Sequence, residues 1–158
     1  MRTTVVILLA TFAASGCKRR PFEEDKVVMV KHDDPEMEAA FAAARSKMAD
    51  FWSRVAKPTA GENGFGVKIP IKDENGTEYV WLTHLSLSDG KVAGTIDNDP
   101  DIVKNVKIGQ RIEMTRESVV DWLYTRDGKM YGNYTVRPLL KRMDPAEAQL
   151  VRARVADP

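Results

Sequence analysis

The spacing of apolar residues changes along the chain, and the change separates a helix from several strands. Between residues 34 and 58, apolar side chains recur every three or four positions, which is the spacing of one helix face. Asp34 suits the N-cap of this helix, and Pro35 suits its first position. The pattern predicts one long helix over residues 35–56 that packs across a sheet. Its apolar stripe consists of Met37, Phe41, Ala44, Met48, Phe51, Trp52 and Val55.

Later segments alternate apolar and polar residues, which is the pattern of β-strands. In residues 65–72 every second side chain is apolar, so we expect Lys68 and Lys72 to face solvent. Short runs at residues 26–31 and 111–114 predict further strands. Three dipeptides typical of tight hairpin turns separate these segments: Asn75-Gly76, Asp89-Gly90 and Asp127-Gly128.

Three helix starts follow in the second half of the chain. Asp99 precedes Pro100 and Asp144 precedes Pro145, and each pair predicts a short helix. Thr135 suits the cap of another. Together the elements predict an α+β fold. We expect an antiparallel, hairpin-built curled sheet of about five to six strands, with one long N-terminal helix packed across it and short C-terminal helices.

The start of the chain has the pattern of a secretory signal peptide, with a positive charge, an apolar run over residues 5–14 and small residues before Cys17. The run is shorter than the roughly 20 apolar residues that span a bilayer. The tetrapeptide Ala14-Ser15-Gly16-Cys17 resembles a bacterial lipobox, with Ala14 in place of the usual Leu. The resemblance implies that Cys17 is lipidated, with acyl chains such as palmitate, and becomes the new N-terminus. The alternative is an ordinary signal peptide that releases a free Cys17.

These features predict four segments. Residues 1–16 form a signal peptide of the lipoprotein type, residues 17–26 a tether, residues 27–142 a single globular domain, and residues 143–158 a C-terminal helix and tail. The anchor predicts a lipid-anchored protein of the bacterial cell envelope. Lys18 follows the Cys where Asp would retain a lipoprotein in the inner membrane. In a bacterium with two membranes, we therefore expect the periplasmic face of the outer membrane.

Composition and charge narrow the functions to consider. Of the 158 residues 43% are hydrophobic, as in ordinary folded proteins. The 24 Lys and Arg residues are balanced by 23 Asp and Glu residues, so nucleic acid is not an expected partner. The single Cys lies at the anchor, and the two histidines, His32 and His84, lie in separate segments. We therefore predict no metal site and no cofactor.

Several short blocks, taken in order, resemble the YegJ-like bacterial family, domain of unknown function 2314. The resemblance runs from about residue 27 to residue 142 and implies a bacterial origin and an α+β domain. It implies no activity, and so no catalytic role for any residue. The blocks are Asp33-Asp34-Pro35-Glu36-Met37, Glu78-Tyr79-Val80-Trp81-Leu82, Asn98-Asp99-Pro100, Val106-Lys107-Ile108-Gly109, Asp121-Trp122-Leu123-Tyr124 and Gly132-Asn133-Tyr134-Thr135-Val136-Arg137.

Two groups of polar residues are candidates for a site. His84 is a candidate general base that Glu78 could orient, although no nucleophile-elbow pattern such as G-x-S-x-G accompanies it. The second group lies on one hairpin and its exit, where Asp121 and Arg137 could form an ion pair within a fold-stabilising network or line a small binding site. This candidate polar cluster comprises Asp121, Tyr124, Asn133, Thr135 and Arg137.

The sequence favours a membrane-anchored binding domain without catalytic machinery, which contacts membrane lipid through Cys17 and a protein or other envelope component through its domain. One alternative is a small envelope hydrolase or transferase that uses His84 with Glu78, or the cluster of Asp121 and Arg137. Another is an inhibitor or immunity-type module that blocks one target protein. Whether the protein is an enzyme stays open at this point.

Overall fold

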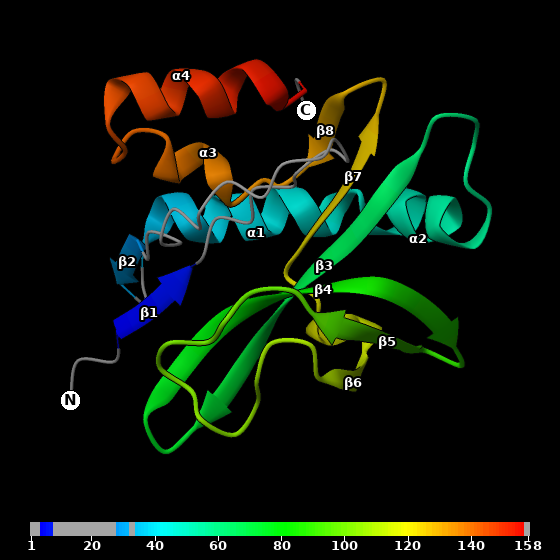
Figure 1. Ribbon diagram of the computed structural model, residues 1–158, viewed down its shortest axis with the longest axis horizontal. Helices are drawn as coiled ribbons and strands as arrows, with labels where there is room; N and C mark the ends of the chain where they lie inside the picture. Colours follow the sequence, from blue (N-terminus) through cyan, green and yellow to red (C-terminus); the bar gives the residue numbers. More distant parts are fainter. Residues whose placement is uncertain (1–3, 8–27, 32–33, 157–158) are drawn as a thin grey trace.

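The computed structural model describes residues 4–7, 28–31 and 34–156 (Figure 1). Cys17 and the predicted tether, residues 17–26, lie outside the described residues. So do residues 1–3 and 8–16 of the predicted signal peptide. Within the described part, no helix is both long enough and apolar enough to span a membrane.

Six strands form an antiparallel sheet whose hairpins follow one another along the chain. The strands are β3 (Asn63–Asp73), β4 (Gly76–Ser88), β5 (Lys91–Ile96), β6 (Arg111–Thr115), β7 (Asp121–Arg126) and β8 (Lys129–Gly132). β3 and β4 lie at the centre, flanked by β7 and β8 on one side and by β5 and β6 on the other. β1 (Thr4–Ile7) pairs parallel to β4, and β2 (Val28–Lys31) pairs with β1 at the edge. The predicted α+β class is confirmed.

The predicted long helix is in fact two consecutive helices, α1 (Pro35–Ser46) and α2 (Met48–Ala56). The carbonyl of Ala44 accepts hydrogen bonds from the Lys47 N–H at 3.2 Å and from the indole of Trp122 at 2.9 Å. In a continuous helix this carbonyl would pair with the residue four positions later. The indole, which comes from the sheet, therefore stabilises a break in the helix at Lys47.

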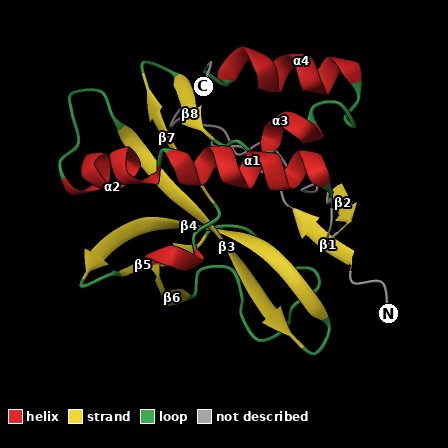
Figure 2. Ribbon diagram, turned by 180° about the vertical axis from the view of Figure 1, so that it is seen from behind, coloured by secondary structure: helices red, strands yellow, loops and turns green. Residues whose placement is uncertain are grey.

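The two helices cross one face of the sheet end to end (Figure 2). Asp34 caps α1 as predicted, because its carboxylate accepts from the N–H groups of Glu36 and Met37. Phe51 of α2 is fully buried and stacks on Trp122 of β7, with ring centroids 5.1 Å apart. Trp52 is only half-buried. The core between helices and sheet thus centres on the Phe51–Trp122 contact.

Two of the three predicted hairpin turns are confirmed, at Asp89-Gly90 and Asp127-Gly128. The first turn is centred one residue earlier than predicted, because Asp73 pairs with Gly76 across it. The predicted short helix after Asp99 is wrong, since residues 97–110 form an irregular loop. This loop takes its shape from Glu78, as described below.

The C-terminal helices are short, as predicted. α3 (Val136–Leu139) follows β8, and α4 (Pro145–Arg154) is capped by Asp144, whose carboxylate accepts from the N–H groups of Ala146 and Glu147. A 3-10 turn, η1 (Arg116–Ser118), joins β6 to β7. The segment between α3 and α4 is tied to the start of α1 by ion pairs from Lys141 to Glu36 and from Arg142 to Asp34.

Candidate functional site

Asp121 lies at the centre of a fully buried polar network between β3, β7 and α3. One carboxylate oxygen accepts from the N–H groups of Trp122 at 2.8 Å and Tyr134 at 3.1 Å. The other accepts from the N–H and the hydroxyl of Thr135, at 2.8 and 2.7 Å. Both oxygens are therefore satisfied within the fold. The Thr135 hydroxyl in turn accepts from the ammonium of Lys68 at 2.7 Å.

Lys68 is the residue that sequence reasoning missed. The alternating pattern places it on the solvent face, but it is 1% exposed and lies opposite Asp121 in the β3–β7 ladder. Its ammonium is 4.7 Å from the centre of the Trp81 ring, a cation–π contact. Burial lowers the pKa of Lys68 to about 8, against the attraction of Asp121. Burial also raises the pKa of Asp121, against Lys68 and the hydrogen bonds from Thr135.

The chain reverses at Gly132 and Asn133, and this reversal places Thr135 over Asp121. Gly132 has a φ of 77°, and a Cβ there would lie 2.2 Å from the carbonyl oxygen of Trp122. Only glycine permits so close an approach of the two backbones. The Asn133 N–H then donates to that same carbonyl at 2.7 Å. The side-chain amide of Asn133 contacts the Met130 sulfur, so it takes no part in the Asp121 network.

Arg137 does not supply the cation for Asp121, which corrects the predicted ion pair. Its guanidinium donates to the carbonyl oxygens of Gly132 at 3.3 Å and Ala156 at 3.1 Å, and it lies 5.1 Å from the Tyr134 ring centre. The carbonyl oxygens accept the hydrogen bonds of the guanidinium, while Lys68 supplies the positive charge near the Asp121 carboxylate. Arg137 therefore ties the C-terminal end of the chain to the exit of β8.

Tyr124 is buried in an aromatic stack, away from Asp121. Its ring stacks on Phe65 at 5.5 Å and on Tyr131 at 5.1 Å, and the Arg54 guanidinium lies 5.5 Å from its centre. The predicted polar cluster is thus divided. The structure brings Asp121 and Thr135 together and assigns Tyr124, Asn133 and Arg137 to separate contacts.

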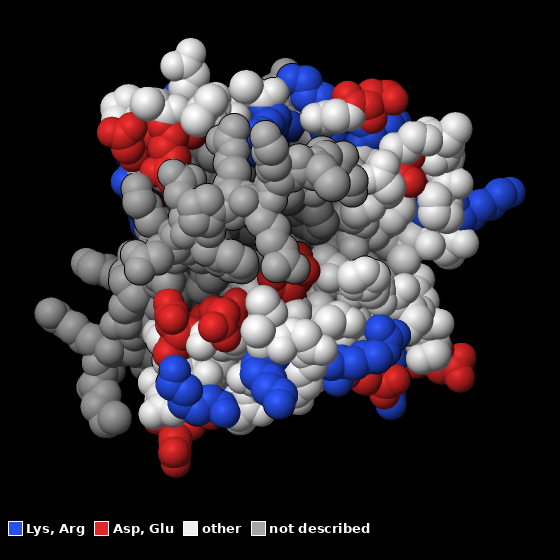
Figure 3. All heavy atoms as spheres, in the orientation of Figure 1, with Lys and Arg blue, Asp and Glu red and all other residues white. Residues whose placement is uncertain are grey.

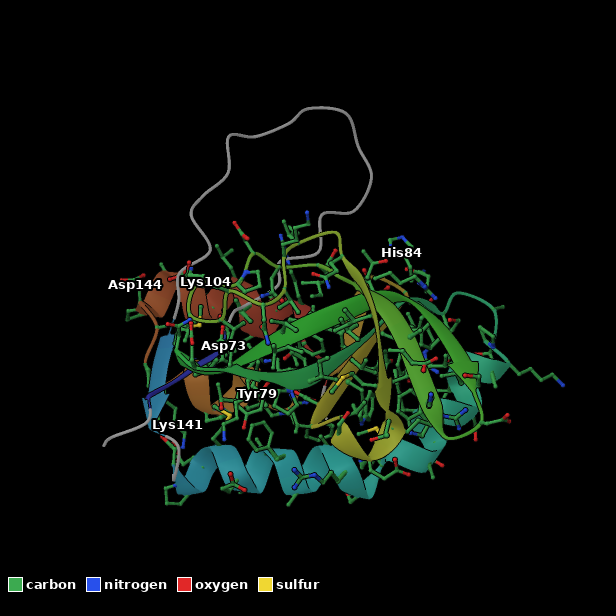
Figure 4. The ribbon with its side chains drawn as sticks, turned by 90° about the horizontal axis from the view of Figure 1, so that it is seen from below. Asp73, Tyr79, His84, Lys104, Lys141 and Asp144 are labelled. Carbon is green, nitrogen blue, oxygen red and sulfur yellow. The ribbon has the colours of Figure 1, made fainter. Side chains whose placement is uncertain are left out.

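Glu78 and His84 do not form the predicted pair. Glu78 is fully buried, and its carboxylate accepts from the N–H groups of Asp101, Ile102 and Val103 at 2.8 to 3.2 Å. These bonds hold the irregular loop after β5. Figure 4 shows His84 well apart from Tyr79, the neighbour of Glu78. Glu78 and His84 are six positions apart on β4, a separation of roughly 20 Å.

His84 lies where the sheet divides. The β3–β4 ladder ends at the pair Val67 and Leu82; beyond it, β3 continues with β7 and β4 with β5 (Figure 1). Each of these two ladders is irregular at the division, between Asn63 and Gly66 on β3 and between Thr83 and Ser86 on β4. We call this division the sheet fork.

A hollow of about 340 Å³ opens in the sheet fork. The imidazole Nδ1 of His84 lies 3.3 Å from the Thr83 hydroxyl, which orients the ring. The walls combine three apolar and three polar side chains, and the volume lies at the lower end of the range for small-ligand sites. The hollow is lined by Val55, Gly64, Phe65, Thr83, His84, Leu85 and Asp97.

Among the residues that the structure describes, no group of three or more His, Cys, Asp or Glu side chains is arranged to hold a metal ion. Figure 3 shows acidic and basic side chains interspersed over the described part of the face that it displays. That part of the face therefore presents no continuous surface of a single charge sign.

Comparison with known proteins shows the relationships of the chain. A family model described as "Uncharacterized protein conserved in bacteria (DUF2314)" matches residues 34–154. The chain belongs to the DUF2314 family. It is 40% identical over 131 residues to "Uncharacterized protein YegJ" of Escherichia coli (strain K12), a match that covers 83% of this chain and 84% of that protein. The predicted resemblance to this family is confirmed.

A more distant relative of this DUF2314 chain is the "Putative ankyrin repeat protein NMB1133/NMB1171" of Neisseria meningitidis serogroup B (strain ATCC BAA-335 / MC58). It is 24% identical over 85 residues, which cover 51% of this chain and 34% of that protein. No solved structure matches the chain significantly.

The DUF2314 match begins at the cap of α1 and ends with α4. The buried network of Lys68, Asp121 and Thr135 lies within it, as does the hollow in the sheet fork. Cys17 lies before it. The family match therefore covers the domain, whereas the predicted anchor at Cys17 lies outside the matched residues.

Proposed function

We propose that this DUF2314 protein is a lipid-anchored binding protein of the bacterial cell envelope. The signal-peptide pattern and the lipobox-like tetrapeptide ending at Cys17 support the anchor. The domain extends from the membrane and binds another envelope component without transforming it. The observation that carries the binding role is the hollow in the sheet fork, which has the size and mixed lining of a ligand site.

The buried network supports binding over catalysis. Its ionisable groups, Asp121 and Lys68, are both enclosed and hydrogen-bonded to Thr135. A group that transfers protons to a substrate must come within hydrogen-bond reach of it. The network instead joins β3, β7 and the start of α3, so we assign it to the stability of the fold.

One contact favours a second candidate function, the small hydrolase. The Thr83 hydroxyl lies 3.3 Å from the imidazole Nδ1 of His84, which is close to the hydrogen-bond distance between a nucleophile and its general base. Glu78 does not orient the ring, since it holds the loop after β5. A screen with chromogenic esters separates the two functions. Turnover that Thr83→Val abolishes, in a variant that keeps its melting temperature, would favour the hydrolase.

The anchor is tested by replacing Cys17. In cells fed radiolabelled palmitate, we expect the natural chain to carry the label and to fractionate with membranes, and Cys17→Ser to lose both. Lys18→Asp is the matched control, because it changes the neighbouring residue and leaves the thiol. It should stay labelled, and in a bacterium with two membranes it should move to the inner membrane. A Cys17→Ser protein that still sediments with membranes would contradict the anchor.

A further inference from the structure

The two irregular ladders place residues of unusual backbone conformation on facing walls of the sheet fork. Gly64 of β3 has a φ of 61°, and His84 of β4 has a φ of 51°. Bulges bend a strand and redirect its side chains, and they are common beside binding sites. Here they hold the two strands apart and turn His84 and Phe65 to the same hollow.

His84 occupies a position that glycine would fill with less strain. The left-handed region is unfavourable for side chains with a Cβ, and His84 adopts it inside a strand, away from any tight turn. Its imidazole is exposed, and Thr83 contacts only Nδ1. Nε2 has no partner among the described residues. The position therefore offers a ligand Nε2, which accepts a hydrogen bond from an amine in the tautomer whose Nδ1–H donates to the Thr83 hydroxyl.

The remaining lining determines the kind of ligand. Val55, Phe65 and Leu85 form apolar walls, and Asp97 is the carboxylate that lines the hollow. The guanidinium of Arg111 donates to the His84 carbonyl at 3.1 Å and to the Ser86 hydroxyl at 2.6 Å, and Arg111 is not among the residues that line the hollow. A cationic head group would therefore pair with Asp97, and an apolar body would cover the walls.

We propose that the hollow in the sheet fork binds a small amphipathic amine, with its head group at Asp97 and His84 and its apolar body against Phe65 and Leu85. This inference rests on the binding role proposed above and specifies the class of ligand. The volume of about 340 Å³ lies at the lower end of the range for small-molecule sites, so it suits a ligand with one ring.

Three one-ring probes whose polar groups are positive, neutral and negative test the class of ligand: benzylamine, benzyl alcohol and benzoate. Each is titrated into the purified full chain in detergent while amide chemical shifts are recorded. We expect saturable shifts centred on Phe65, His84 and Leu85, with millimolar affinity for a probe of this size. Affinity should fall from benzylamine to benzyl alcohol to benzoate.

Two variants and a control assign the contacts. Asp97→Asn should weaken benzylamine about tenfold, the effect of losing a charge-assisted hydrogen bond, and leave benzyl alcohol unchanged. His84→Gly keeps the backbone conformation but removes the imidazole, so it should weaken benzylamine and benzyl alcohol alike. Asp127→Gly is the matched control, because Asp127 has a φ of 52° at a hairpin turn outside the hollow. It should bind as the natural chain does.

Three outcomes would overturn the ligand class: no saturable shift with any probe, tightest binding of benzoate, or an unchanged amine preference in Asp97→Asn. These results would leave the anchor intact, since lipidation of Cys17 is measured separately in cells. Conversely, a chain that binds benzylamine as expected but is not lipidated would refute only the anchor.

Discussion

The ammonium of Lys68 lies 2.7 Å from the Thr135 hydroxyl, on the strand face where alternation predicted solvent. The face is covered because the segment after β8 crosses it, where Thr135 bonds to Lys68 and the N–H groups of Tyr134 and Thr135 donate to Asp121. Trp81 and Asp121 flank Lys68 on the neighbouring strands. A charge buried there requires a partner of opposite sign. Asp121 provides it, and Thr135 bridges the two.

Breaking this buried pair should destabilise the domain strongly. Lys68→Met leaves the Asp121 carboxylate buried without a cation, at a cost on the order of 3–5 kcal/mol in the free energy of unfolding. Urea denaturation measures the change. The double variant with Asp121→Asn should cost less than the sum of the two single variants. Lys72→Met is the control, since Lys72 lies four positions after Lys68 on β3 and is exposed. It should change stability by about 0.5 kcal/mol or less.

The same lysine predicts a dependence of stability on pH. The pKa of Lys68 is about 8 in the folded chain and near 10.5 when unfolded, so between these values the unfolded state binds more protons. Stability should therefore rise with pH across this window, by an amount on the order of 3 kcal/mol relative to Lys68→Met. Denaturation of both proteins at pH 8, 9 and 10 gives the difference. If the stabilities of the natural chain and of Lys68→Met changed equally with pH, Lys68 would not titrate between pH 8 and pH 10.

At the scale of the elements, Glu78 determines the conformation of the loop after β5. Its carboxylate accepts the N–H groups of residues 101, 102 and 103. In a helix capped by Asp99 the first two would lack an intrahelical acceptor, and the third would donate to the Asp99 carbonyl, so Glu78 takes the first helical hydrogen bond. Asp73 holds the next N–H, that of Lys104, at 2.6 Å, and Figure 4 shows the two side by side. Two carboxylates of the β3–β4 hairpin thus replace the predicted helical turn.

Glu78→Gln should loosen this loop while the sheet stays intact. The amide keeps the shape of the side chain but loses the charge and one acceptor oxygen, which should cost about 1–3 kcal/mol. Hydrogen exchange should accelerate at the amides of residues 101–103 more than in β3. Glu113→Gln, at an exposed ion pair with Lys91, should change neither stability nor exchange measurably. Unchanged exchange in Glu78→Gln would mean that other contacts hold the loop.

At the scale of the whole molecule, the buried apolar residues that the structure describes run from Met37 to Ala148. Processing at the proposed lipobox would remove β1, which pairs with Thr77 to Tyr79 of β4. A chain that begins at residue 17, with Cys17→Ser, should therefore melt within about 5 °C of the full chain, equivalent to roughly 1–2 kcal/mol. Its amides at residues 77–79 should exchange faster, since their neighbouring strand is gone. A loss of cooperative melting would show that β1 belongs to the core.

Features that depend on near neighbours were predictable from the sequence. The caps at Asp34 and Asp144 bond to N–H groups two and three residues later, and the turns at residues 89–90 and 127–128 close on their own flanking strands. The α+β class follows from such signals, because each period of the apolar pattern reports on its own segment. The family resemblance likewise rested on short blocks.

Only the tertiary structure decided the features whose partners lie far along the chain. The helix break at Lys47 depends on Trp122, 78 positions from the Ala44 carbonyl that it binds. The burial of Lys68 depends on Thr135, 67 positions away. The hollow beside His84 arises where the β3–β7 and β4–β5 ladders diverge. The sequence of one strand does not show where its ladder separates from another. Periodicity identifies which face of a strand is apolar, but it cannot show whether a second layer covers the other face, and that coverage determines where the charges pair.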